Sequence, residues 1–143
     1  MILKEITEFS QQLLLEINSL LSQLTEHKIN FKESNLLSII NSENSILLGA
    51  FYGTKLIGIL TLIIYQIPTA FCGRIEDVVV DTKFRGNGIG KMLSLEAIKR
   101  GKELNLDKIF LTSNPNRIVA NQLYQKIGFQ LGQTNSYFYT YKK

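Results

Sequence analysis

The spacing of apolar positions changes along the chain, and each change predicts a different kind of element. Residues 6–25 place apolar side chains at helical spacing with polar residues opposite, and a shorter helix is expected over residues 33–41. The β-rich runs SILLGAFY (45–52) and LIGILTLIIYQI (56–67) predict two strands joined by a hairpin turn at residues 53–55. RIEDVVVD (74–81) predicts a third strand after a loop at residues 68–73.

The second half of the chain returns to helical spacing and then alternates. Ile89, Met92, Leu93 and Ala97 form one stripe of a helix that ends near residue 104, and KIFLTS (108–113) predicts a short strand. NPNR (114–117) opens another helix, which Gly128 ends. A strand is expected from residue 129 and another in SYFYTYK (136–142). This order, α-α-β-β-β-α-β-α-β-β, predicts an α/β fold in which helices pack on a mixed sheet.

Length and charge narrow the classes of protein. A chain of 143 residues that is 45% hydrophobic is expected to form one domain, residues 1–143, with a substantial core. The net charge of +4 suits an anionic partner of several kinds. The only dense basic run is the terminal Tyr-Lys-Lys, so we expect no nucleic-acid partner.

Single cysteine and histidine residues restrict the chemistry further. Cys72 alone excludes an internal disulfide, and His27 alone argues against a histidine-rich metal site, so no metal is expected. The start of the chain does not resemble a signal peptide, and the apolar run at residues 56–67 is too short to span a bilayer. We therefore expect a cytoplasmic protein without a membrane partner.

Three alternate glycines stand between the predicted third strand and the helix that follows it. The stretch 85–90 reads RGNGIG. A dinucleotide fingerprint fails because Lys91 and Leu93 occupy positions that need glycine, and a Walker loop fails because Met92 follows Lys91. Glycines at a strand-to-helix turn still bring bare N–H groups to a helix N-terminus, where they bind anions. The alternative is a tight turn whose glycines only supply positive φ.

The same stretch resembles the R/Q-x-x-G-x-G/A signature of the GNAT superfamily of acyl-CoA-dependent N-acetyltransferases. Two further segments agree with it: IEDVVVD lies just before the signature, and VANQLYQKIGF (119–129) lies at the expected distance after it. The resemblance covers residues 47–141 in element order. It implies a mostly antiparallel central sheet flanked by helices, and acetyl-CoA as cosubstrate.

The resemblance also implies which residues bind the cofactor. The backbone of residues 78–80 would pair with the pantetheine arm and polarise the thioester carbonyl, because a strand edge splayed by a bulge offers unpaired amides. Residues 86–91 would wrap the pyrophosphate. The full implied set is Val78, Val79, Val80, Arg85, Gly86, Asn87, Gly88, Ile89, Gly90, Lys91, Asn114, Arg117, Asn121 and Tyr124.

Two residues are candidates for proton transfer. Tyr124 matches the family tyrosine that protonates the departing thiolate, although its position in an apolar stripe also fits a core residue. Glu76 matches a frequent acidic position facing the acceptor amine, where a carboxylate takes a proton directly or through water. A salt bridge is the alternative for Glu76. Simple alternation predicts that Glu76 faces away from Asp77 and shares a face with Val78 and Val80.

One position departs from the family pattern. Many members carry asparagine seven residues before the tyrosine, where this chain has Arg117. Asn114 and Asn116 are nearby substitutes, and contact of Arg117 with a CoA phosphate is the alternative.

The leading interpretation is transfer of an acetyl group from acetyl-CoA to a primary amine of a small molecule or peptide. Direct transfer in a ternary complex is expected because no covalent nucleophile stands out. The alternative is a non-catalytic acyl-CoA-binding or sensor domain of the same fold. The acceptor is not identified; its loops are expected at residues 25–33, 67–73 and 134–139. A homodimer is left open.

Overall fold

The computed structural model of the protein describes residues 1–142, which fall into two compact units. The first unit is Met1–Thr112, and the second begins at Ser113.

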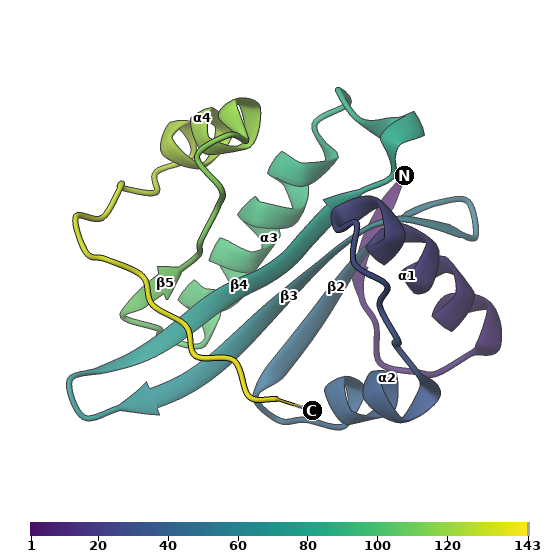
Figure 1. The fold of residues 1–143 in the computed structure, drawn as a ribbon, viewed down its shortest axis with the longest axis horizontal. Coiled ribbons are helices and arrows are strands. Elements are labelled where there is room, and N and C mark those ends of the chain that lie inside the picture. The colour runs from purple at the N-terminus through teal and green to yellow at the C-terminus, as the bar shows by residue number, and fades with distance from the viewer. Residues whose placement is uncertain (143) are drawn as a thin grey trace. The chain divides into compact units, whose positions relative to one another are not determined.

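A five-stranded sheet forms the centre of the first unit (Figure 1). Its strands are β1 (Ile2–Glu5), β2 (Ser45–Tyr52), β3 (Lys55–Ile67), β4 (Ala70–Val80) and β5 (Lys108–Phe110), in the spatial order β1-β2-β3-β4-β5. The first three pairings are antiparallel, and only β4 and β5 run parallel. The prediction of a mixed, mostly antiparallel sheet is confirmed.

Helices cover both faces of this sheet. Helices α1 (Gln11–Leu24) and α2 (Glu33–Ile40) pack on one face, and their buried residues form a core cluster with Ile59 and Val79 of the sheet. Helix α3 (Ile89–Glu103) packs on the other face: a Cβ on Gly58 would lie 3.3 Å from side-chain atoms of Ile89 and Leu93. Since neighbouring strand residues point to opposite faces, Gly58 and Ile59 contact different helices.

The first helix begins later than its apolar pattern predicts. Residues 2–5 form edge strand β1, which the sequence analysis missed. Ser10 then caps α1 by accepting a hydrogen bond from the Leu13 N–H at 3.1 Å, so the helix starts at Gln11 rather than at residue 6. The element before the cap is a strand because its backbone pairs with β2, which local spacing does not reveal.

The predicted loop at residues 68–73 is also wrong. The connection is a tight turn at Pro68 and Thr69, and β4 begins at Ala70. Its first residues pair with β3 on one side, and Cys72–Arg74 pair with β5 on the other. Cys72 is fully buried in this part of the sheet. Most of the expected acceptor loop at residues 67–73 is therefore strand.

The second unit contains helix α4 (Ile118–Lys126), which ends near Gly128 as predicted. The strands expected from residue 129 and at residues 136–142 are absent from the described chain. The aromatic pattern of that segment favours strand, but a strand needs a paired neighbour to be stable. Its side chains at residues 137, 138, 139 and 141 are between 78% and 93% exposed. Across residues 1–142, no helix is both long and apolar enough to cross a membrane.

Candidate active site

The outer edge of β4 loses its strand partner halfway along. Strand β5 pairs with β4 only over Cys72–Arg74, and from Ile75 to Val80 the described chain provides no strand on that side. Unpaired backbone N–H and C=O groups on a strand edge bind an extended ligand as an added strand would. The edge that opens includes Val78, Val79 and Val80, the residues expected to pair with the pantetheine arm.

A β-bulge lies where this edge opens. Glu76 pairs with Thr61 and Val79 with Ile59, so Asp77 and Val78 together oppose the single residue Leu60. Asp77 has a φ of 51°, which an aspartate tolerates better than most residues. A bulge of this kind bends the strand and disrupts its ladder locally. The bulge expected in this strand from the resemblance is present.

The bulge corrects the expected orientation of Glu76. Paired residues share a face, so Glu76 lies on the same face as Thr61, Ile59 and Val79. Val80 pairs with Gly58 and therefore lies on the opposite face. The prediction that Glu76 shares a face with Val78 and Val80 is wrong, because the extra residue shifts the alternation by one.

Glu76 forms an ion pair on its own strand. Its Oε1 accepts a hydrogen bond from Arg74 Nε at 2.6 Å, and both side chains are more than one-third exposed. Partial burial raises the pKa of the neighbouring Asp77 carboxyl, and the negative charge of Glu76 raises that pKa further. Two carboxylates and one arginine thus stand at the bulge, and the salt bridge considered for Glu76 is present.

The turn after β4 contains two glycines with positive φ angles. A short 3-10 helix, η1 (Thr82–Phe84), leads into it, and Gly86 and Gly88 have φ values of 84° and 77°. A Cβ on either glycine would meet no atom within 4 Å, so the space above the turn is open. These two glycines are therefore required by backbone conformation and not by crowding.

Helix α3 begins at the end of this turn without a capping side chain. Gly88 is its N-cap residue and, within the described residues, no side chain caps it; its first turn contains no acidic residue. Free N–H groups at the start of a helix attract anions through their partial positive charge. Lys91 is exposed in the first turn and adds a full positive charge. The arrangement suits a phosphate group.

Two side chains fix the turn to the chain before it. Arg85 Nε donates to the Val80 carbonyl at 3.1 Å, and Asn87 Nδ2 donates to the Phe84 carbonyl at 2.9 Å. Both residues are exposed. Arg85 and Asn87 therefore have a structural task in addition to the cofactor contact expected of them.

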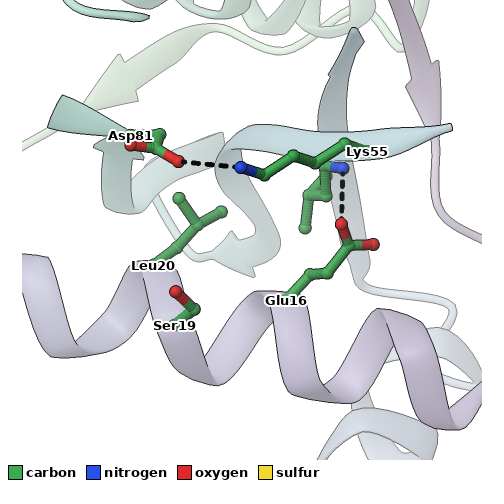
Figure 2. A pocket seen from close by; sticks show the side chains of 6 residues that line it. Glu16, Ser19, Leu20, Lys55 and Asp81 are labelled. Carbon is green, nitrogen blue, oxygen red and sulfur yellow. Dashed lines mark hydrogen bonds and ion pairs between the residues drawn. The ribbon is translucent and has the colours of Figure 1, made fainter. Parts of the chain in front are cut away.

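A small polar hollow lies beside this region, between α1 and the ends of β3 and β4. Figure 2 shows Glu16 and Ser19 of α1 on the helix side, Lys55 and Asp81 opposite them, and Leu20 between Ser19 and Asp81. Glu16 accepts a hydrogen bond from the Leu56 N–H at 3.2 Å. The hollow measures about 40 Å³, little more than the volume of one water molecule, so it does not hold a substrate.

The remaining candidates belong to the second unit. Tyr124 is 7% exposed, and its ring meets that of Phe129 edge-on at 5.9 Å. Burial raises the pKa of the Tyr124 hydroxyl, and the charge of Arg117 lowers it by less. The hydroxyl therefore carries its proton at neutral pH, as a general acid must.

Hydrogen bonds of the asparagines in this unit hold the segment that leads into α4. The Asn114 carbonyl accepts from the Arg117 N–H and from Asn121 Nδ2, both at 3.0 Å, and Asn114 Oδ1 accepts from the Asn116 N–H at 2.9 Å. Arg117 occupies the N-cap position of α4 without a side-chain capping bond among the described residues. Asn114 and Asn121 are thus already engaged in local hydrogen bonds, which the sequence pattern did not indicate.

The predicted site residues fall into two groups, one in each unit. Glu76, the strand edge at Val78–Val80 and the turn at residues 85–91 follow one another within Met1–Thr112, whereas Tyr124 and its neighbours belong to the other unit. Sequence reasoning missed Arg74, the partner of Glu76. It also missed Ser113, whose buried Oγ has no hydrogen-bond partner among the described residues, an unusual situation for a buried hydroxyl.

Comparison with known families gives a match over most of the chain. The model of the acetyltransferase (GNAT) family matches residues 13–129. That stretch contains the bulged strand, the glycine turn and helix α4.

Individual relatives are more distant. A glucosamine 6-phosphate N-acetyltransferase of Trypanosoma brucei brucei is 36% identical over 58 residues, covering 41% of this chain and 37% of that protein. An uncharacterized N-acetyltransferase of Bacillus subtilis, YvbK, is 32% identical over 82 residues, covering 57% and 51%. The match thus spans about half the length of these curated relatives, or less.

A solved structure agrees over nearly the whole chain. An aminoglycoside acetyltransferase from an uncultured soil metagenomic sample, in complex with trehalose, superposes with a TM-score of 0.87 at 20% identity and covers 99% of this chain and 96% of that one. At this identity the likeness shows the fold.

Proposed function

Because this chain belongs to the GNAT acetyltransferase family, we propose that it transfers an acetyl group from acetyl-CoA to a primary amine of a small molecule or peptide. The transfer is direct, within a ternary complex of enzyme, acetyl-CoA and amine. Acetyl-CoA is the cosubstrate expected for the family. The proposed reaction uses no metal ion.

One observation carries the proposal: an opened strand edge runs directly into an uncapped helix N-terminus. Val80 ends β4, and Gly88, the N-cap residue of α3, follows only eight positions later in the numbering. An extended amide-bearing chain with a phosphate group at one end matches that pair of features, since the strand edge bonds amides and the helix start binds anions. The pantetheine arm and pyrophosphate of CoA have this composition.

Each residue then has a defined task in the proposed reaction. The backbone of Val78–Val80 bonds the pantetheine arm, and one of its N–H groups polarises the thioester carbonyl, where negative charge develops in the transition state. The amides of residues 86–91 bind the pyrophosphate. Lys91 lies in the first turn of α3 and is exposed, which supports its contribution of charge.

Proton transfer is assigned to Tyr124 and Glu76. The attacking amine must lose a proton, and Glu76 accepts it directly or through water; the departing thiolate must gain one, and Tyr124 donates it. The raised pKa of Tyr124 keeps this proton on its hydroxyl at neutral pH until the thiolate forms. Glu76 Oε1 is held by Arg74, and the second carboxylate oxygen has no hydrogen bond within residues 1–142, which leaves it for the amine.

The acceptor is proposed only as a class. The curated relative from Trypanosoma acts, by its name, on an amino sugar phosphate, and the solved relative is named for aminoglycosides. Amino sugars are therefore the first acceptors to test on this chain. The cytoplasmic location, the single domain and the absence of nucleic-acid and membrane partners stay predictions.

The alternative, a non-catalytic acyl-CoA-binding domain, differs in one measurable respect. It binds acetyl-CoA without releasing CoA, whereas the enzyme releases one thiol for each amine acetylated. A panel of glucosamine 6-phosphate, an aminoglycoside, a polyamine and a lysine peptide, followed by thiol release and by mass spectrometry of the amine, separates the two. Binding of acetyl-CoA with no acetylated product across a broadened panel would favour the alternative.

A further inference from the structure

The 3-10 helix η1 is held from several sides just before the glycine turn. From α1, Gln23 Oε1 accepts a hydrogen bond from the Thr82 N–H at 2.9 Å, and from β3 the Ile57 carbonyl accepts from the Asp81 N–H at 2.8 Å. Asp81 also caps η1, because its Oδ1 accepts from the Lys83 N–H at 3.0 Å. η1 is therefore an anchored element, although it is only three residues long.

The tip of the β2–β3 hairpin, residues 52–55, supplies two further contacts. Tyr52 at the end of β2 places its ring 5.6 Å from the ring of Phe84, in a tilted arrangement. Lys55 at the start of β3 places Nζ 3.8 Å from Asp81 Oδ2 and 6.0 Å from the centre of the Phe84 ring. The hairpin tip thus contacts both ends of η1.

Phe84 links these contacts to the glycine turn. Its N–H donates to the Asp81 carbonyl at 2.8 Å, and its own carbonyl accepts from Asn87 Nδ2 at 2.9 Å. Asn87 immediately precedes Gly88, the N-cap residue of α3. A shift of Phe84 would therefore move the turn whose amides are proposed to meet the pyrophosphate.

The two charged side chains of this contact differ in how far they are exposed to solvent. The Asp81 side chain is 11% exposed, and Lys55 is 54% exposed. A nearly buried carboxylate depends on its few partners, so loss of the lysine leaves it held mainly by the Lys83 N–H. The pair is thus a sensitive point for the position of η1.

We propose that the hairpin tip, through Tyr52 and Lys55, positions the glycine turn for binding the pyrophosphate of acetyl-CoA. The inference rests on the proposed function of the turn. Tyr52, Lys55 and Asp81 act as positioning residues, because they reach the cofactor site only through η1, Phe84 and Asn87.

Two substitutions of opposite charge test the proposal. Lys55→Met removes a positive charge and Asp81→Asn a negative one, while the amide oxygen of the new asparagine side chain would still be available to the Lys83 N–H. If these residues act through position, both variants weaken CoA binding by up to about fivefold, the range expected for an ion pair with one half-exposed partner. If they act by charge alone, Lys55→Met weakens binding and Asp81→Asn strengthens it, because CoA is an anion.

The donor molecule provides the second readout. S-acetylpantetheine carries the thioester and the amide arm but no pyrophosphate, so kcat/KM for this donor should stay unchanged in both variants. With acetyl-CoA, KM should rise while kcat changes little. Lys4→Met is the matched control: Lys4 Nζ also lies over a phenylalanine ring, that of Phe51 at 4.7 Å, but on β1 and without contact to η1.

Tyr52→Ala tests the same positioning role without changing any charge, and it replaces Asp81→Asn if that variant fails to fold. Tyr52 is 63% exposed, so its truncation should leave the fold intact and still raise the Kd for CoA. Opposite effects of the two charge variants, or equal losses with both donors, would overturn the positioning role. Failure of the wild-type protein to bind CoA at all would instead overturn the proposed function.

Discussion

Replacing Gly88 tests the phosphate site most directly. Gly88 has a φ of 77° and a ψ of 13°, and a Cβ there would meet no atom within 4 Å. A side chain at this position therefore costs backbone strain but no steric clash. In Gly88→Asp the new carboxylate would project from the N-cap position, beside the amides that we assign to the pyrophosphate.

The magnitude follows from two separate terms. A left-handed conformation costs an L-residue about 1–2 kcal/mol, which lowers the free energy of unfolding and not the affinity. Two like charges about 4 Å apart repel by about 1 kcal/mol in water and about 4 kcal/mol at a partly shielded protein surface. Because Gly88 is exposed, the lower half of that range applies, about 1 to 2.5 kcal/mol, and the Kd for CoA should rise roughly 5- to 70-fold.

Isothermal calorimetry with CoA measures this change, and Gly88→Asn is the matched control. Asparagine has nearly the same shape and tolerates the left-handed conformation, but it carries no charge. Both variants should lose similar thermal stability, while only the aspartate should show the full loss of affinity. A folded Gly88→Asp protein that binds CoA as tightly as the wild type would refute the placement of the pyrophosphate at this turn.

Three further substitutions test the remaining assignments. Tyr124→Phe should lower kcat by about 10²-fold or more with little change in the Kd for acetyl-CoA, and near-normal turnover with chemistry rate-limiting would make Tyr124 a core residue. Glu76→Gln should reduce kcat/KM most near neutral pH and less at alkaline pH, where more of the amine is already neutral. A parallel drop at all pH values with a lower Tm would instead assign Glu76 to its structural pair with Arg74. Asp77 has a raised pKa, so its carboxyl holds a proton more tightly in the folded state, and its contribution to stability, present at acid pH, is lost as the pH rises through that pKa. Asp77→Asn should therefore raise the Tm slightly at pH 7, and the gain should vanish at about pH 3; an equal Tm difference between variant and wild type at both pH values would contradict this account.

Local signals identified much of this fold and part of its site. Apolar spacing located α2, α3 and α4 to within a few residues. A helix buries one stripe of its surface, and the residues of that stripe recur every three or four positions, so the pattern can be read from the sequence. The turn at Gly86 and Gly88 was equally visible, since positive φ is a demand on single residues that glycine meets best. These features depend on residues close together in the chain.

The features that local spacing missed depend on partners far away in the chain. Alternation placed Glu76 with Val78 and Val80, yet the bulge at Asp77 moves it to the face of Val79, because the register is set by pairing with β3. Strand β1 forms because its backbone pairs with β2. The aromatic segment at residues 136–142 forms no strand, because β-propensity alone does not make a strand without backbone pairing to a neighbour. The contact of Lys55 with Asp81 joins residues 26 positions apart in the numbering, and it forms because the sheet brings the start of β3 beside the end of β4.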